Sequence, residues 1–102
     1  MSVSLQVLYP VGDDTQFNHD YYTATHIPLV GKHMGEHIDS TSISKGLAGG
    51  PDVPAGFYVV ATMIFASMDN LQAALEVAGP VLADIPNFTN TEPKMLIGEV
   101  IA

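Results

Sequence analysis

The chain has 102 residues, 47% of them hydrophobic, which is enough for one buried core, and we expect one domain over residues 1–102. Three lysines against eleven acidic residues give a formal net charge of −8, so we expect neither nucleic acid nor an anionic membrane as a partner. The sequence contains no cysteine, which excludes disulfides and a cysteine nucleophile. No apolar run approaches the roughly twenty residues of a membrane span and no signal peptide is visible, so we expect a cytoplasmic protein.

The first predicted element is a strand over residues 3–9, in which apolar residues alternate with Ser4 and Gln6. Asp13 and Gln16 have the spacing of a capping box, so a helix is predicted from near Asp14 to about residue 25. Pro28 lacks a backbone donor and predicts an interruption, followed by a short turn that ends near residue 35.

The second half of the chain contains three more predicted strands and one more helix. The second strand is polar and typical of a sheet edge, whereas the third is apolar on both faces. Ser67 is the expected cap of the second helix, which Gly79 and Pro80 interrupt. The predicted ranges are residues 38–45, 57–67 and 95–101 for the strands, 47–56 for a Gly/Pro-rich connection, and 68–86 for the helix.

The order β-α-β-β-α-β predicts an α+β, ferredoxin-like fold with a four-stranded antiparallel sheet. Right-handed crossovers place the first and third strands at the centre and the second at an edge. Helices cover only one face of such a sheet, so a central strand that is apolar on both faces needs a second cover. The sequence therefore predicts a homodimer in which two sheets pair face to face.

A motif in the first half of the chain resembles the EthD-like family. Residues 17–29 read FNHDYYTATHIPL, with an aromatic residue, a tyrosine pair, and then histidine, one residue, proline and leucine. Residues 8–10, 83–88 and 96–100 are also similar to that family. The resemblance implies a dimeric α/β barrel, a fold shared with small cofactor-free oxygenases, muconolactone isomerases and haem-degrading enzymes. It implies no particular reaction, because for most members none is established.

Six residues are candidates for a site. Tyr22 and His26 lie four residues apart on one predicted helix face, and a phenol beside an imidazole suits proton transfer, so they are the catalytic candidates. His26 is expected near a helix C-terminus, whose partial negative charge favours imidazolium. Substrate-binding candidates are the residues that flank this pair or lie on the central strands: His19, Leu29, Tyr9 and Tyr58. The alternative is structural, with His26 bonded to the carbonyl freed by Pro28 and Tyr22 in packing.

No metal and no cofactor are expected. His33, Glu36 and His37 match the H-x-x-E-H zinc motif, but Gly35 and the following strand argue against one continuous helix there. The chain also lacks a Gly-rich phosphate loop.

The leading functional hypothesis is an EthD-like enzyme or accessory factor that acts on a small hydrophobic organic ligand by cofactor-independent acid/base chemistry. It would be an isomerase, dehydratase or oxygenase-like protein of organic compound degradation or secondary metabolism. The alternative is a non-catalytic binding or sequestering protein of the same fold. A haem-binding relative is a third hypothesis, disfavoured because the chain has no arginine to pair with propionates.

Overall fold

Four antiparallel strands form one sheet in the order β2-β3-β1-β4 in this computed structural model, which describes residues 1–102. Their bounds are Val3–Pro10 for β1, Ser40–Lys45 for β2, Phe57–Phe65 for β3 and Lys94–Glu99 for β4. The predicted arrangement is confirmed, because the first and third strands are central and the polar second strand is at an edge.

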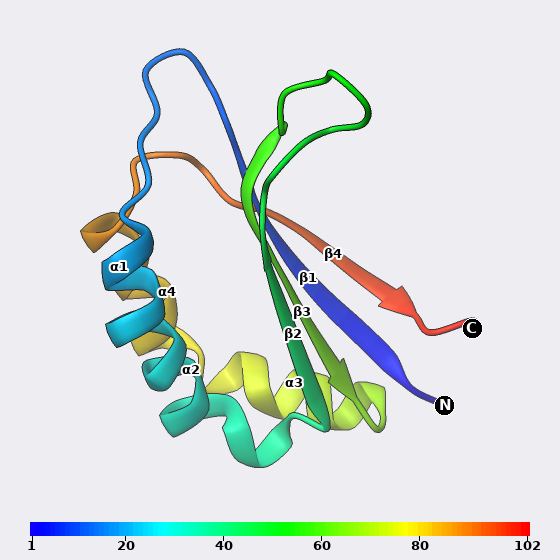
Figure 1. The fold of residues 1–102 in the computed structure, drawn as a ribbon. Helices are drawn as coiled ribbons and strands as arrows, with labels where there is room; N and C mark the ends of the chain where they lie inside the picture. The colour runs from blue at the N-terminus through cyan, green and yellow to red at the C-terminus, as the bar shows by residue number, and fades with distance from the viewer.

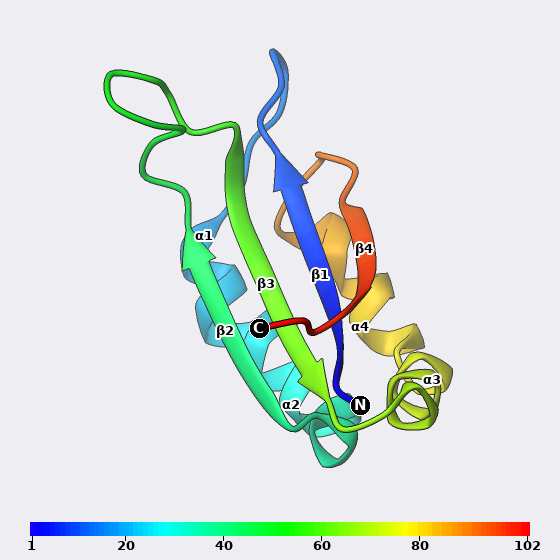
Figure 2. The ribbon, with the colours of Figure 1, turned by 90° about the vertical axis from the view of Figure 1, so that its right-hand side faces the viewer.

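The helices all lie on one face of the sheet, and the other face is bare of helices, with only the C-terminal tail running in front of it (Figures 1 and 2). The helical bounds are His19–Tyr21 for α1, Tyr22–His26 for a π-helical turn, Ile27–Met34 for α2, Met68–Glu76 for α3 and Gly79–Asp84 for α4. Two 3-10 turns, Gly35–His37 and Ile85–Asn87, follow α2 and α4. This is the predicted α+β, ferredoxin-like fold. None of the helices has the length and hydropathy that crossing a membrane requires.

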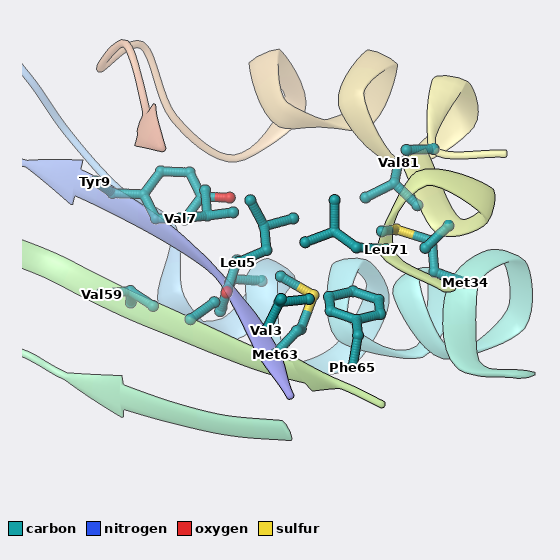
Figure 3. Packing of buried hydrophobic residues seen from close by; sticks show 14 of the residues in the cluster. Val3, Leu5, Val7, Tyr9, Met34, Val59, Met63, Phe65, Leu71 and Val81 are labelled. Atoms are coloured by element: carbon teal, nitrogen blue, oxygen red, sulfur yellow. The ribbon is translucent and has the colours of Figure 1, made fainter. Parts of the chain in front are cut away.

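The core lies between the sheet and the helices, as Figure 3 shows. Residues of β1 alternate between buried and half-buried, as the period of a strand requires. Leu5 is opposite Met63 on β3 and Ile97 on β4, so three strands contribute side chains to the same face. Phe65 and Leu71 are the most completely buried large side chains, and they join the end of β3 to α3.

The predicted start of the first helix is wrong. Asn18 is the N-cap, and its side-chain oxygen accepts a hydrogen bond from the Tyr21 backbone nitrogen at 3.1 Å. The residues before it do not form a helix, because Phe17 pairs with Thr89 in an isolated β-bridge. The Asn18 nitrogen also donates to the Phe88 carbonyl at 2.8 Å. Pairing with a distant segment of the chain thus overrides the local capping signal.

Pro28 widens the first helix and does not break it. The Ile27 nitrogen donates to the Tyr22 carbonyl, the spacing of a π-helix, and α2 continues with Pro28 in its first turn. His26 therefore lies inside a helical segment, and the expectation that it lies near a helix C-terminus is wrong. The second helix agrees with prediction, because Ser67 caps α3 and a break at residues 77–78 separates α3 from α4.

Candidate functional site

A cavity of about 50 Å³ lies between the sheet and the helices. Sixteen of its eighteen lining residues are hydrophobic, and the lining comes from all four strands, the π-helical turn, the helices α2, α3 and α4, and the 3-10 turn after α4. The cavity therefore suits an apolar ligand, and its few polar groups determine what chemistry is possible there.

Three of the candidate residues line this cavity: Tyr9, Tyr22 and His26. The side chains of Tyr22 and His26 stack with their ring centroids 5.3 Å apart, and Tyr9 packs edge-on against Tyr22 at 5.8 Å. Tyr9 is 2% exposed, and Tyr22 and His26 are each 3% exposed. The π-helical turn presents Tyr22 and His26 together to the cavity, and β1 presents Tyr9 from the sheet.

His26 is paired with an acidic residue of the other helical layer. Its Nδ1 lies 2.9 Å from Oδ2 of Asp84, which is itself buried near the end of α4. Oδ1 of Asp84 accepts hydrogen bonds from the Tyr21 hydroxyl at 2.7 Å and from Asn87 Nδ2 at 3.0 Å. Burial alone raises the pKa of Asp84, but hydrogen bonds from Asn87, Tyr21 and His26 outweigh it and hold this pKa below its ordinary value.

The carboxylate also determines which imidazole nitrogen is available. An ionised Asp84 only accepts hydrogen bonds, so Nδ1 of His26 must carry the proton of that contact. In the neutral ring the lone pair is then on Nε2. A histidine oriented in this way by a buried carboxylate is the arrangement of a general base.

The two tyrosines on the cavity stay protonated over the physiological pH range. Burial raises the pKa of Tyr22 to about 12. Burial, with a smaller contribution from the neighbouring Tyr22, also raises the pKa of Tyr9 well above its ordinary value. Both phenols are therefore hydrogen-bond donors toward anything that enters the cavity.

The other candidates lie outside the cavity. The Tyr58 hydroxyl is 2.7 Å from the Thr15 hydroxyl, and its ring stacks on Phe17 at 5.5 Å. His19 packs against Phe17 at 4.7 Å and against Tyr58 at 6.4 Å. Leu29 is half-buried against the core but does not line the cavity. The structure thus brings Tyr9, Tyr22 and His26 together at the cavity. His19 and Tyr58 reach this group only through Phe17, whose ring also contacts Tyr9 and Tyr22.

No three histidine or acidic side chains of residues 1–102 are close enough to hold a metal ion. Within the H-x-x-E-H motif, His33 is in α2 and His37 is in the following 3-10 turn, where its Nε2 lies 3.4 Å from Glu36 Oε1.

Asp84 is a site residue that the sequence motifs did not indicate. Its signal is positional, because Asp84 continues the spacing of the buried residues Ala74, Ala78 and Val81. A carboxylate on the buried stripe of a helix requires a hydrogen-bonding partner, but its position in the sequence does not identify that partner.

Comparison with known proteins supports the family resemblance of the motif at residues 17–29. The EthD domain profile matches residues 12–92. An EthD-like protein from Ralstonia eutropha JMP134 is 32% identical, with a TM-score of 0.88 over 99% of this chain and 93% of that chain. No curated protein matches the chain.

Two further solved structures share the fold at low identity. SnoaB, a cofactor-independent oxygenase from Streptomyces nogalater, is 9% identical with a TM-score of 0.62, over 98% of this chain and 95% of that chain. A dimeric ferredoxin-like protein of unknown function from Thermobifida fusca YX is 10% identical with a TM-score of 0.59, over 98% and 92%. Identities this low show similarity of fold alone.

Proposed function

The chain belongs to the EthD domain family, and from its buried cavity we propose that it is an enzyme that transfers a proton on a small hydrophobic organic molecule. The observation that carries this proposal is the His26–Asp84 pair on the wall of an apolar cavity. A buried carboxylate costs free energy unless it is paired, and this one is held by three hydrogen bonds, as a preorganised site requires.

Each residue of the site has a distinct role in this proposal. His26 takes and returns the proton through Nε2, and Asp84 is the positioning residue that orients the imidazole and stabilises its charged form. Tyr22 donates a hydrogen bond to the substrate, and Tyr9 is the second polar group on the cavity. A positioned general base of this kind contributes roughly 10²–10⁴-fold to a rate.

The chemistry requires only groups of this chain, so we propose a cofactor-independent reaction. Isomerisation and dehydration both begin with removal of a proton from carbon, and an oxygenase-like reaction begins with ionisation of the substrate. The fold shared with a cofactor-independent oxygenase is compatible with this range but does not choose within it.

We also propose that the protein acts as a homodimer that buries the bare face of its sheet (Figure 2). Leu8 on β1 is opposite Val60 on β3, Ile64 lies further along the same face of β3, and all three are half-buried in the single chain. The dimeric ferredoxin-like protein from Thermobifida fusca supports this assembly by analogy of fold.

Deuterium exchange at carbon tests the proposal with a panel of candidate substrates. Hydrophobic ketones are incubated with the protein in deuterium oxide, and loss of the C–H signal is followed by proton NMR. We expect the wild-type protein to accelerate exchange for some members, and His26→Gln to lower that rate by about 10²-fold or more. Tyr58→Phe is the matched control, because Tyr58 lies outside the cavity.

A binding protein of the same fold gives a different result. Its ligands would bind to the wild-type protein, His26→Gln would weaken their binding, and no exchange would occur with either variant. That outcome would overturn the enzymatic proposal.

A further inference from the structure

We propose that the hydroxyls of Tyr9 and Tyr22 form a donor pair that holds one oxygen atom of the ligand, so that the site takes enolisable ketones and phenols. This inference rests on the proposed function, because it assigns a substrate class to the same cavity. It adds the group that binds the oxygen and the chemical reason for that choice.

The tyrosines of the chain divide into two pairs. The Tyr21 hydroxyl donates to Asp84, and the Tyr58 hydroxyl is bonded to Thr15. No hydrogen bond joins the hydroxyl of Tyr9 or Tyr22 to any protein group, although both residues are at least 97% buried. Each hydroxyl is therefore satisfied from outside the protein, by a water or by a ligand oxygen, and one ligand oxygen that accepts from both would displace that water.

Both hydroxyls border the cavity. The structure contains no sealed polar side-chain atom that lacks a partner, so these two unpaired hydroxyls must contact accessible space. Both residues line the cavity, and Figure 3 shows the Tyr9 side chain in the space between β1 and the helices. His26 lines the same space, and its Nε2 also has no protein partner.

The chemistry of these groups selects the ligand. The two phenols are protonated donors that approach one space from β1 and from the π-helical turn, so they fit an acceptor with two lone pairs, such as a carbonyl or enolate oxygen. Nε2 of His26 is an acceptor, so it fits an acidic hydrogen on the ligand. A ketone with a hydrogen on the neighbouring carbon provides both groups, and so does a phenol. No lysine or arginine lines the cavity, which disfavours carboxylates and phosphates.

The proton transfer balances within these groups. The C–H bond beside the carbonyl breaks, its proton goes to Nε2 of His26, and its electron pair forms a carbon–carbon double bond. The π electrons of the carbonyl move onto the oxygen, which accepts hydrogen bonds from Tyr9 and Tyr22. In a ketone that has a carbon–carbon double bond beyond that carbon, the enolate is conjugated, and return of the proton to its far end completes an isomerisation with no oxidant or reductant.

The cavity determines how the rest of the ligand lies. Its volume of about 50 Å³ is well below the roughly 150 Å³ of a cavity that holds benzene, so only the oxygen-bearing end fits while the lining side chains stay in place. Leu75, Leu82 and Met95 line the cavity but are 38%, 45% and 49% exposed. They form an apolar rim between β4 and the helices α3 and α4, where a hydrophobic ligand body lies once these side chains move.

Binding of 4-nitrophenol, compared with nitrobenzene, tests the inference without turnover. The two probes have similar shapes, but only the phenol has an oxygen for the two tyrosines, and its ionisation changes its visible absorption. We expect the phenol to bind at least ten-fold more tightly than nitrobenzene, in its ionised form. Tyr9→Phe and Tyr22→Phe should each weaken its binding by about ten-fold or more, the effect of one hydrogen bond to a charged group, whereas Tyr58→Phe should not.

Several results would overturn the inference. They are the absence of binding by the phenol, equal affinity for both probes, and wild-type affinity in Tyr9→Phe and Tyr22→Phe proteins that remain folded by circular dichroism. The proposed function fails separately. A protein that binds the nitrophenolate through both tyrosines but catalyses no deuterium exchange retains the oxygen-binding pair and is not an enzyme of the proposed kind.

Discussion

Asp84 Oδ2 and His26 Nδ1 are 2.9 Å apart, although 58 positions separate the two residues in the chain. The pair joins the π-helical turn to α4 across the helical layer, and both partners are buried. The contact therefore stabilises the packing of the helices and also orients the imidazole, and these two effects can be measured separately.

Replacement of Asp84 by asparagine should lower the free energy of unfolding at neutral pH by roughly 1.5–3 kcal/mol, because the hydrogen bonds to Asp84 then lose their charged acceptor. Urea unfolding measures this loss. Glu76→Gln is the matched control, since it removes a charge from an exposed position of α3 and should change stability by less than about 0.5 kcal/mol.

The same pair predicts a pH dependence. The pKa of Asp84 in the folded protein is below its ordinary value of 3.8, so folding favours the ionised carboxylate. The resulting stability is present above 3.8 and is lost as the pH falls through the folded pKa. The difference in stability between the wild-type protein and Asp84→Asn should therefore shrink in acid, and a difference that is constant with pH would contradict this account.

The unpaired tyrosines predict an unusual stability pattern. Tyr9→Phe and Tyr22→Phe remove hydroxyls without protein partners, so neither should lower the free energy of unfolding. Tyr21→Phe removes a hydrogen bond to Asp84 and should cost about 1 kcal/mol or more. Thermal unfolding of the three variants gives the comparison, and equal losses in all three would show that the Tyr9 and Tyr22 hydroxyls have partners in the folded protein.

The bare sheet face predicts a dimer. A single lysine introduced on that face should separate the dimer into monomers. Val60 is central on that face, and a charge there would be buried between two sheets, so Val60→Lys should produce a monomer. Thr25→Lys introduces the same charge at an exposed position of the helical layer and should leave the dimer intact. Light scattering distinguishes a mass of 10.8 kDa from twice that value. A monomeric wild-type protein would contradict the assembly.

The cap of the first helix can also be tested. Asn18→Ala removes the side-chain acceptor for the Tyr21 nitrogen and should cost about 1 kcal/mol of stability. Asp13→Ala should have almost no effect, because Asp13 is exposed in the loop before the helix. A larger loss of stability in Asp13→Ala than in Asn18→Ala, measured by chemical denaturation, would support the capping box at Asp13 and contradict the cap at Asn18.

The fold could be predicted because its signals are periodic and local. Alternation in β1, the apolar run of β3, Ser67 at the start of α3, and the interruption just before Gly79 and Pro80 each depend on neighbouring residues, and the structure confirms them. The start of the first helix could not be predicted in this way, because it depends on the bridge between Phe17 and Thr89, which joins distant segments of the chain.

The site was predicted only in part, for a related reason. Spacing along one helix brought Tyr22 and His26 together, and strand adjacency suggested Tyr9. The Asp84 contact depends on how two helices pack, which helical spacing does not encode. Tyr58 was expected at the cavity but is left unpaired where the register of β1 and β3 shifts, and there its hydroxyl bonds to Thr15 and its ring stacks on Phe17.

The central claim is that His26 presents a free Nε2 to the cavity while Asp84 holds the proton on Nδ1. Nitrogen NMR of protein labelled at histidine, at a pH where the ring is neutral, measures this tautomer directly. We expect Nδ1 of His26 to carry the hydrogen, and the unprotonated Nε2 signal to shift when 4-nitrophenol is added. A neutral ring protonated at Nε2, or an Nε2 signal that is unchanged by bound ligand, would contradict the account.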